Sequence, residues 1–119
     1  MAQHSRFAQL TSDAKSRIRE IAPTEAGQQQ AAGAILIDVR ESDEFANGHA
    51  RDAVHLSRGI LELRIEQIIP DETTPLICYC GGGSRSALAT DSLQKMGYTN
   101  VASLAGGFKA WKEAGLPTE

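Results

Sequence analysis

Cys80 stands between an apolar segment and a glycine-rich loop, in the sequence CGGGSR at positions 80–85. The thiolate is the reactive form of cysteine, and a helix N-terminus or a neighbouring arginine lowers the pKa of a thiol from about 8.5 to roughly 3.5–7.5. The three glycines allow a tight turn whose N–H groups point inward, because no Cβ atom obstructs the concavity. Ser84 or its neighbour is expected to begin a helix, whose N-terminal amides and dipole add positive potential at the same place. These residues predict an anion-sized cradle around an easily ionised Cys80.

Three arginines and one aspartate are further candidates for this pocket. Arg85 either supplies positive charge beside Cys80 or ties the loop in place. Arg58 follows a predicted strand, where it lies either on the pocket rim, attracting an anion, or on the solvated surface. Asp38 and Arg40 close another predicted strand, so either of them is a candidate for lining the pocket.

The second cysteine and two histidines suggest a disulfide, a Cys–His pair or a metal site, and the sequence favours none of these. Cys78 lies inside an apolar run and is predicted to be a core residue, and a disulfide to Cys80 would have to span an awkwardly short extended segment. His49 and His55 suggest a Cys–His nucleophilic pair, but a thiolate stabilised by a helix needs no general base. No Cys/His set has the ligand spacing of a zinc site, so no metal is expected.

Short apolar runs alternate with helical patterns through most of the chain. Four runs are typical of strands buried on both faces: 34–40, 53–56, 75–80 and 100–104. The helical patterns cover 41–47, 59–69, 84–96 and 108–114. Such alternation predicts a parallel sheet with helices on both faces, whose ligands bind beyond the carboxyl ends of the strands. Cys80 is expected at that edge.

Two helices are predicted before the first of these strands. Apolar residues at positions 7, 10, 14, 18 and 21 recur at helical spacing, which predicts an amphipathic helix from Phe7 to Ile21 that packs on the core. A short second helix is expected to begin near Thr24 and to end at Gly33.

The composition is that of one ordinary globular domain. The chain has 119 residues, of which 41% are hydrophobic and 23% charged, with a net charge of -3. Both signs of charge are spread along the sequence, so no footprint for nucleic acid or an anionic membrane is visible. No apolar run approaches the roughly 20 residues that span a bilayer, and the polar N-terminus lacks the core of a secretory signal. We therefore expect a cytoplasmic protein.

Taken together, the motifs resemble the rhodanese family, which often ends its loop with Cys-x-x-Gly-x-Arg, here Cys80, Gly83 and Arg85. The resemblance covers roughly 33–117 and also includes LIDVRE at 36–41, EF at 44–45, GH at 48–49, LAGGF at 104–108, Trp111, Gly115 and Pro117. The chain departs from the family pattern at 50–52, where ARD replaces a typical Ile-Pro-Gly, and at Ser57, where proline is frequent. These departures concern local loop geometry more than Cys80.

The resemblance implies an α/β, rhodanese-like fold with a small central parallel sheet flanked by helices on both faces. We expect a single rhodanese domain at 1–119, with an N-terminal helix at about 5–22 and a core at about 33–117. It also implies that Asp38 and Arg40 belong to an internal polar network that holds loops in place.

The resemblance further implies a sulfurtransferase in which the catalytic Cys80 takes the outer sulfur of a donor such as thiosulfate as a persulfide and passes it to cyanide or a thiol. No metal or organic cofactor is required. The expected partners are a small sulfur-containing anion or thiol and a sulfur-donor or acceptor protein, not nucleic acid or membrane. The residues expected to bind substrate are Gly81, Gly82, Gly83, Ser84, Arg85 and Arg58.

Two alternatives stay open. Some members of the fold are non-enzymatic binding or regulatory modules, but an intact Cys80 and glycine loop count against that role. Phosphatases and arsenate reductases of related architecture keep five residues between cysteine and arginine, whereas this chain has four between Cys80 and Arg85.

Overall fold

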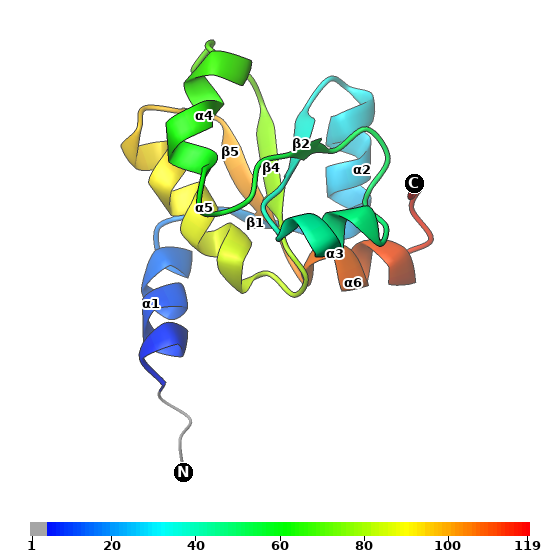
Figure 1. Ribbon diagram of the computed structural model, residues 1–119, viewed down its shortest axis with the longest axis horizontal. Helices are drawn as coiled ribbons and strands as arrows, with labels where there is room; N and C mark the ends of the chain where they lie inside the picture. The colour runs from blue at the N-terminus through cyan, green and yellow to red at the C-terminus, as the bar shows by residue number, and fades with distance from the viewer. Residues whose placement is uncertain (1–4) are drawn as a thin grey trace.

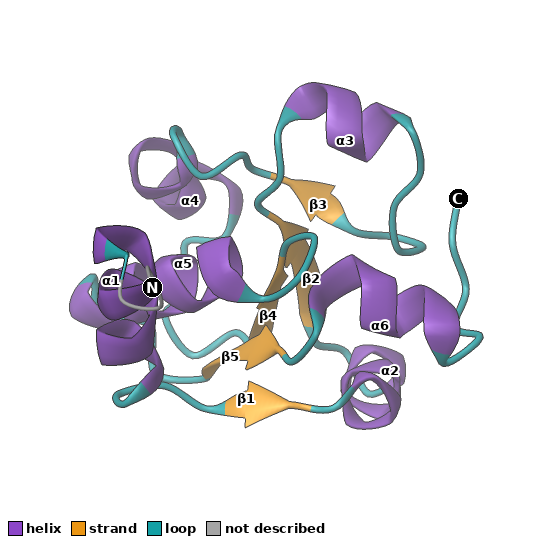
Figure 2. Cartoon of the chain, turned by 90° about the horizontal axis from the view of Figure 1, so that it is seen from below, coloured by secondary structure: helices purple, strands orange, loops and turns teal. Residues whose placement is uncertain are grey.

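The computed structural model, which describes residues 5–119, is built around a five-stranded parallel sheet with helices on both faces (Figures 1 and 2). The strand order is β1-β5-β4-β2-β3. The strands are β1 (Glu20–Ile21), β2 (Ile35–Asp38), β3 (Val54–His55), β4 (Leu76–Tyr79) and β5 (Val101–Leu104). This arrangement confirms the predicted fold class. Residues 1–4 of the predicted domain lie outside the described residues.

The helices divide between the two faces of the sheet. On one face lie α1, α4 and α5, and on the other lie α2 and α6 (Figure 2). The short α3 lies near the edge where the strands end (Figure 1). The bounds are α1 (Arg6–Lys15), α2 (Pro23–Ala31), α3 (Ser42–Ala46), α4 (Leu61–Ile68), α5 (Ser84–Lys95) and α6 (Gly107–Glu113).

The alternation of side chains along β4 divides its residues between two hydrophobic clusters. Leu76, Cys78 and Cys80 pack with residues of α4 and α5, whereas Ile77 and Tyr79 pack with residues of α2 and α6. Because both faces are covered, the strand reads as an uninterrupted apolar run. The same alternation places the Cys80 side chain on the α5 side of the sheet.

The predicted extent of the N-terminal helix is wrong. Helix α1 ends at Lys15, and Ile21 belongs to the edge strand β1, which the sequence analysis missed. Pairing with β5 overrides the helical periodicity here. Glu20 and Ile21 gain backbone hydrogen bonds at the sheet edge, and the Ile21 side chain becomes buried. The expected apolar face is also incomplete: Ala14 is buried, but Phe7 and Leu10 are 52% and 55% exposed. Within residues 5–119, no helix is both long and apolar enough to cross a membrane.

Two leucine substitutions test where the core lies. Leu36 in β2 is fully buried, whereas Leu63 in α4 is 76% exposed. Leu36→Ala is expected to lower the free energy of unfolding by about 2–5 kcal/mol, because it removes buried methyl groups and leaves a cavity. Leu63→Ala is the matched control and should change it by less than about 0.5 kcal/mol in the same urea titration. Equal losses in the two variants would contradict the assignment of the core.

Candidate active site

Cys80 lies directly after β4, and the loop 81–83 carries the chain from that strand into α5 (Figure 2). The Cys80 side chain is buried, with 1% of the residue exposed. Gly83 precedes α5 with φ of 109°, a conformation that glycine adopts without the steric penalty of a Cβ atom. The strand, loop and helix thus occur in the order that the sequence predicted, and they aim the N-terminus of α5 at the sulfur.

Backbone N–H groups and one hydroxyl of the loop and helix converge on the Cys80 sulfur. The backbone N–H of Gly83 lies 3.1 Å from Sγ and that of Ser86 lies 3.4 Å from it. The Ser86 hydroxyl lies 3.6 Å from the same sulfur and is fully buried. Ser86 lies outside the cradle that the sequence predicted, which ended at Arg85. Its position in the first turn of the predicted helix was the signal that could have found it.

These donors decide the ionisation of Cys80. Burial by itself would raise the pKa of the thiol, because it disfavours the charged form. Hydrogen bonds from the Ser86 hydroxyl and from the amides of Ser86, Gly83 and Gly82 outweigh burial and hold the pKa of Cys80 below its usual value. These hydrogen bonds therefore make the thiolate, the nucleophilic form of cysteine, easier to form.

Arg85 covers the loop and is fixed by a carboxylate from α3. Its Nη1 and Nη2 donate to the two carboxylate oxygens of Glu44 at 2.7 and 3.1 Å. The Arg85 hydrogen bond is the main cause that lowers the pKa of Glu44 to about 2. The guanidinium folds back over Gly81, where a Cβ atom would lie 3.3 Å from Nη2. Arg85 thus ties the loop to α3. Its pKa is raised, mainly by the hydrogen bond to Glu44 and to a smaller extent by the nearby Cys80.

The start of α6 holds the other side of the loop. The backbone N–H of Phe108 donates to the Cys80 carbonyl at 2.7 Å, and that of Lys109 donates to the Gly81 carbonyl at 3.3 Å. Gly107 has φ of 60°, and a Cβ atom there would lie 2.5 Å from the Cys80 carbonyl oxygen. Two carbonyls of the loop are therefore held toward α6, which leaves the loop amides free to face the sulfur.

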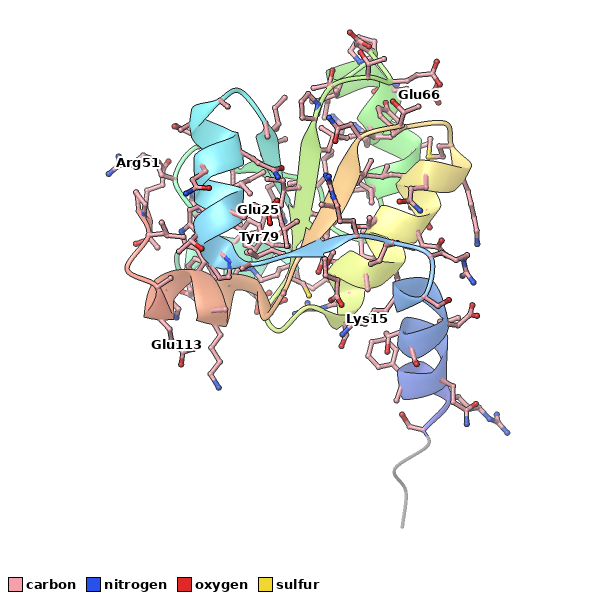
Figure 3. All side chains as sticks on the ribbon, turned by 180° about the vertical axis from the view of Figure 1, so that it is seen from behind. Lys15, Glu25, Arg51, Glu66, Tyr79 and Glu113 are labelled. Carbon is pink, nitrogen blue, oxygen red and sulfur yellow. The ribbon has the colours of Figure 1, made fainter. Side chains whose placement is uncertain are left out.

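Asp38 and Arg40 form a buried ion pair at the end of β2. Arg40 Nη2 donates to Asp38 at 2.8 Å and to the Gly48 carbonyl at 2.8 Å, and its guanidinium lies 4.5 Å from the centre of the Phe108 ring. Neighbouring Tyr79 lies in the interior of the molecule (Figure 3), and its hydroxyl accepts from the Ala50 N–H at 3.0 Å. These contacts join the strand ends to the loop at 48–50 and to α6, as a supporting network requires.

Arg58 and Cys78 are not among the residues that donate to the Cys80 sulfur. Arg58 pairs with Glu62 at 2.6 Å and donates to the Ser92 hydroxyl at 3.1 Å, so its predicted part in substrate binding stays a prediction. Cys78 is fully buried, and burial raises the pKa of its thiol to about 12. A thiol with such a pKa is protonated at neutral pH, which suits a core residue.

His49 and His55 both contact backbone carbonyls. His55 Nε2 lies 2.8 Å from the Arg40 carbonyl, and His49 Nδ1 lies 2.9 Å from the Phe45 carbonyl. Their rings stack on the Phe45 ring, with centroids 3.7 Å away for His49 and 4.5 Å away for His55. Both histidines thus hold the segment around α3, which carries Glu44 to Arg85.

The fold and this site agree with the family assignment. The family model for the rhodanese-like domain matches residues 22–114, and the chain belongs to that family. A thiosulfate sulfurtransferase GlpE of Haemophilus influenzae is 37% identical over 101 residues, covering 85% of this chain and 94% of the relative. The GlpE of Pseudomonas entomophila is 35% identical over 97 residues, covering 82% of this chain and 87% of the relative.

Solved structures resemble the whole chain. A Rhodopseudomonas palustris protein of unknown function, described as a "Possible Tyrosine Phosphatase", superposes with a TM-score of 0.88 at 29% identity and covers 100% of this chain and 98% of its own. The polysulfide-sulfur transferase homodimer of Wolinella succinogenes superposes with a TM-score of 0.81 at 30% identity, covering 96% of this chain and 87% of its own.

A pair of glycines tests the contact between α6 and the loop. Gly107→Ala forces a Cβ atom into the backbone of Cys80 and Gly81, so the loop must move and Cys80 should be alkylated by iodoacetamide at least about tenfold more slowly at neutral pH. Gly115→Ala is the control, because Gly115 has a similar φ of 75° but open space at its Cβ position. Equal alkylation rates in the two variants would show that the close approach of α6 does not shape the loop.

The ion pair between Glu44 and Arg85 predicts a pH dependence of stability. The pKa of Glu44 is lowered from 4.5 to about 2 in the folded protein, so its contribution to stability is complete above 4.5 and is lost as pH falls toward 2. Glu44→Gln should therefore flatten the decline of the unfolding free energy between those pH values, measured by urea titration. Glu113→Gln is the control, since Glu113 points away from the body (Figure 3), and it should leave the decline unchanged. A wild-type slope in Glu44→Gln would contradict the assigned pairing.

Proposed function

We propose that this chain is a sulfurtransferase that carries a sulfur atom on Cys80 as a persulfide, taking it from a donor such as thiosulfate. The observation that carries the proposal is the convergence of two amides and one hydroxyl on a buried Cys80 sulfur. The similarity to proteins named thiosulfate sulfurtransferase, at 33–38% identity, supports the substrate class.

In the first step the Cys80 thiolate attacks the outer sulfur of thiosulfate. A bond forms between Sγ and that sulfur, the sulfur–sulfur bond of thiosulfate breaks, and its electron pair leaves with sulfite. The charges balance, because a thiolate and a dianion give a persulfide anion and a sulfite dianion. No proton needs to move, so no general base is required beside Cys80.

In the second step a nucleophile removes the outer sulfur of the persulfide. Cyanide attacks that sulfur and forms thiocyanate, and the electron pair of the sulfur–sulfur bond returns to Cys80 as a thiolate; a thiol acceptor would react through its own thiolate. The fixed amides of the loop stabilise the negative charge in the resting protein and in the intermediate without reorienting. The proposed substrates are therefore small sulfur-containing anions and thiols, or a protein that presents such a group.

The alternatives fit the site less well. A phosphatase or arsenate reductase of this fold would need room for a tetrahedral dianion, whereas only four residues separate Cys80 from Arg85 and the Arg85 charge is already matched by Glu44. A non-enzymatic module has no need to lower the pKa of Cys80. The cytoplasmic location and the independence from a cofactor stay predictions.

Replacing Cys80 tests the proposal. Cys80→Ser should reduce the production of thiocyanate from thiosulfate and cyanide to the rate without protein, because a hydroxyl does not form the persulfide. The measurement is steady-state thiocyanate formation, with circular dichroism to show that the variant is folded. Turnover by a folded Cys80→Ser variant would refute the mechanism.

Cys78→Ser is the matched control two residues earlier. This change places a hydroxyl in the apolar core and should lower the free energy of unfolding by about 1–3 kcal/mol, while most of the turnover remains. If the folded Cys78→Ser variant also lost all thiocyanate formation, the assignment of Cys78 to the core would be wrong.

A further inference from the structure

A second buried hydroxyl lies behind Ser86. The Oγ atoms of Ser86 and Ser103 are 2.8 Å apart, and both residues are fully buried. Ser103 belongs to β5, the strand beside β4, where it pairs with Cys78 in the parallel register. Ser103, Ser86 and Cys80 thus form a short line of buried polar groups, joined through the Ser86 hydroxyl.

The available hydroxyl protons determine which group donates and which accepts along this line of hydrogen bonds. Each serine hydroxyl donates one hydrogen bond, whereas a sulfur anion only accepts. When Cys80 is anionic, Ser103 donates to Ser86 and Ser86 donates to the sulfur, so both hydroxyl protons are used. When a neutral thiol donates to Ser86, the directions reverse, and among residues 5–119 the Ser103 hydroxyl has no side-chain hydrogen-bond partner besides Ser86 to receive its proton. A buried donor left unsatisfied is costly, so the line favours the anion.

We propose that Ser103 is a positioning residue for the sulfur nucleophile: its buried hydroxyl donates to Ser86 and thereby directs the Ser86 hydroxyl toward the Cys80 anion. The inference deepens the proposed function, on which it rests for its role in sulfur transfer. The charge lies on Sγ itself in the resting thiolate, the form that begins each proposed cycle. Ser103 therefore favours the charged nucleophile without touching either substrate.

The Ser103 side chain can be changed without removing the backbone bonds that place β5. The Ser103 N–H donates to the Arg19 carbonyl at 2.9 Å, and the pairing of β5 with β4 and β1 uses backbone atoms. The carbonyl of Ser86 has a separate partner, since Thr90 Oγ1 donates to it at 2.8 Å. Thr90 therefore supports the Ser86 backbone but not the Ser86 hydroxyl, which makes it a suitable comparison.

The test measures the alkylation of Cys80 by iodoacetamide as a function of pH, with the modified residue identified by peptide mass spectrometry. Ser103→Ala should raise the midpoint of the alkylation profile by about 0.5–1 pH unit, which slows alkylation about 3–10-fold below the midpoint. Thr90→Val removes a buried hydroxyl from α5, the helix that also carries Ser86, and should leave the midpoint unchanged. An unchanged midpoint in Ser103→Ala, or an equal shift in Thr90→Val, would overturn the proposal.

Two further variants distinguish an effect of Ser103 through the Ser86 hydroxyl from an effect of its side-chain volume. In a Ser86→Ala background, Ser103→Ala should add nothing to the shift, because the hydroxyl that Ser103 directs is gone; an undiminished effect would overturn the proposal. If Ser103→Ala does not fold, Ser103→Cys takes its place, since it is nearly isosteric but a weak donor and should shift the midpoint in the same direction. The assay contains no sulfur donor, so a failure of the proposed sulfur transfer would appear in thiocyanate formation and not in these midpoints.

Discussion

The structure depends on one requirement: a thiol that is almost fully buried ionises only where hydrogen-bond donors are directed at its sulfur. An uncompensated buried charge is prohibitively costly, so the anion is sustained only by hydrogen bonds directed at it. The amides of Gly83 and Ser86 and the Ser86 hydroxyl supply them, and they lower the pKa of Cys80 against the opposing effect of burial. Because these donors sit on the loop and at the first turn of α5, they are in place before any substrate arrives.

The parts that hold the loop come from both faces of the sheet. Helix α5 approaches the sulfur from one face, while the first amides of α6, on the other face, bind the carbonyls of Cys80 and Gly81. From the strand edge, α3 contributes Glu44, which fixes Arg85 across the loop. The loop is thus clamped by three separate elements that follow different strands. A parallel sheet favours this geometry, because all of its strands end at the same edge.

The sequence was sufficient for the features that depend on local pattern. Short apolar runs identified four strands, and the glycine loop located Cys80 between β4 and α5. Features that depend on contacts distant in sequence were missed: the edge strand β1 forms only because β5 lies beside it, and Phe7 is exposed although its spacing fits a buried stripe. The pairing of Glu44 with Arg85 joins positions 41 residues apart, so spacing alone gave no sign of it.

Intact mass spectrometry after brief incubation with thiosulfate shows whether Cys80 carries the transferred sulfur. We expect a gain of one sulfur atom, localised to Cys80 by peptide mapping and removed by subsequent cyanide. Thiocyanate formation while no sulfur is ever found on Cys80, or while the added sulfur is found on Cys78, would refute sulfur transfer through Cys80.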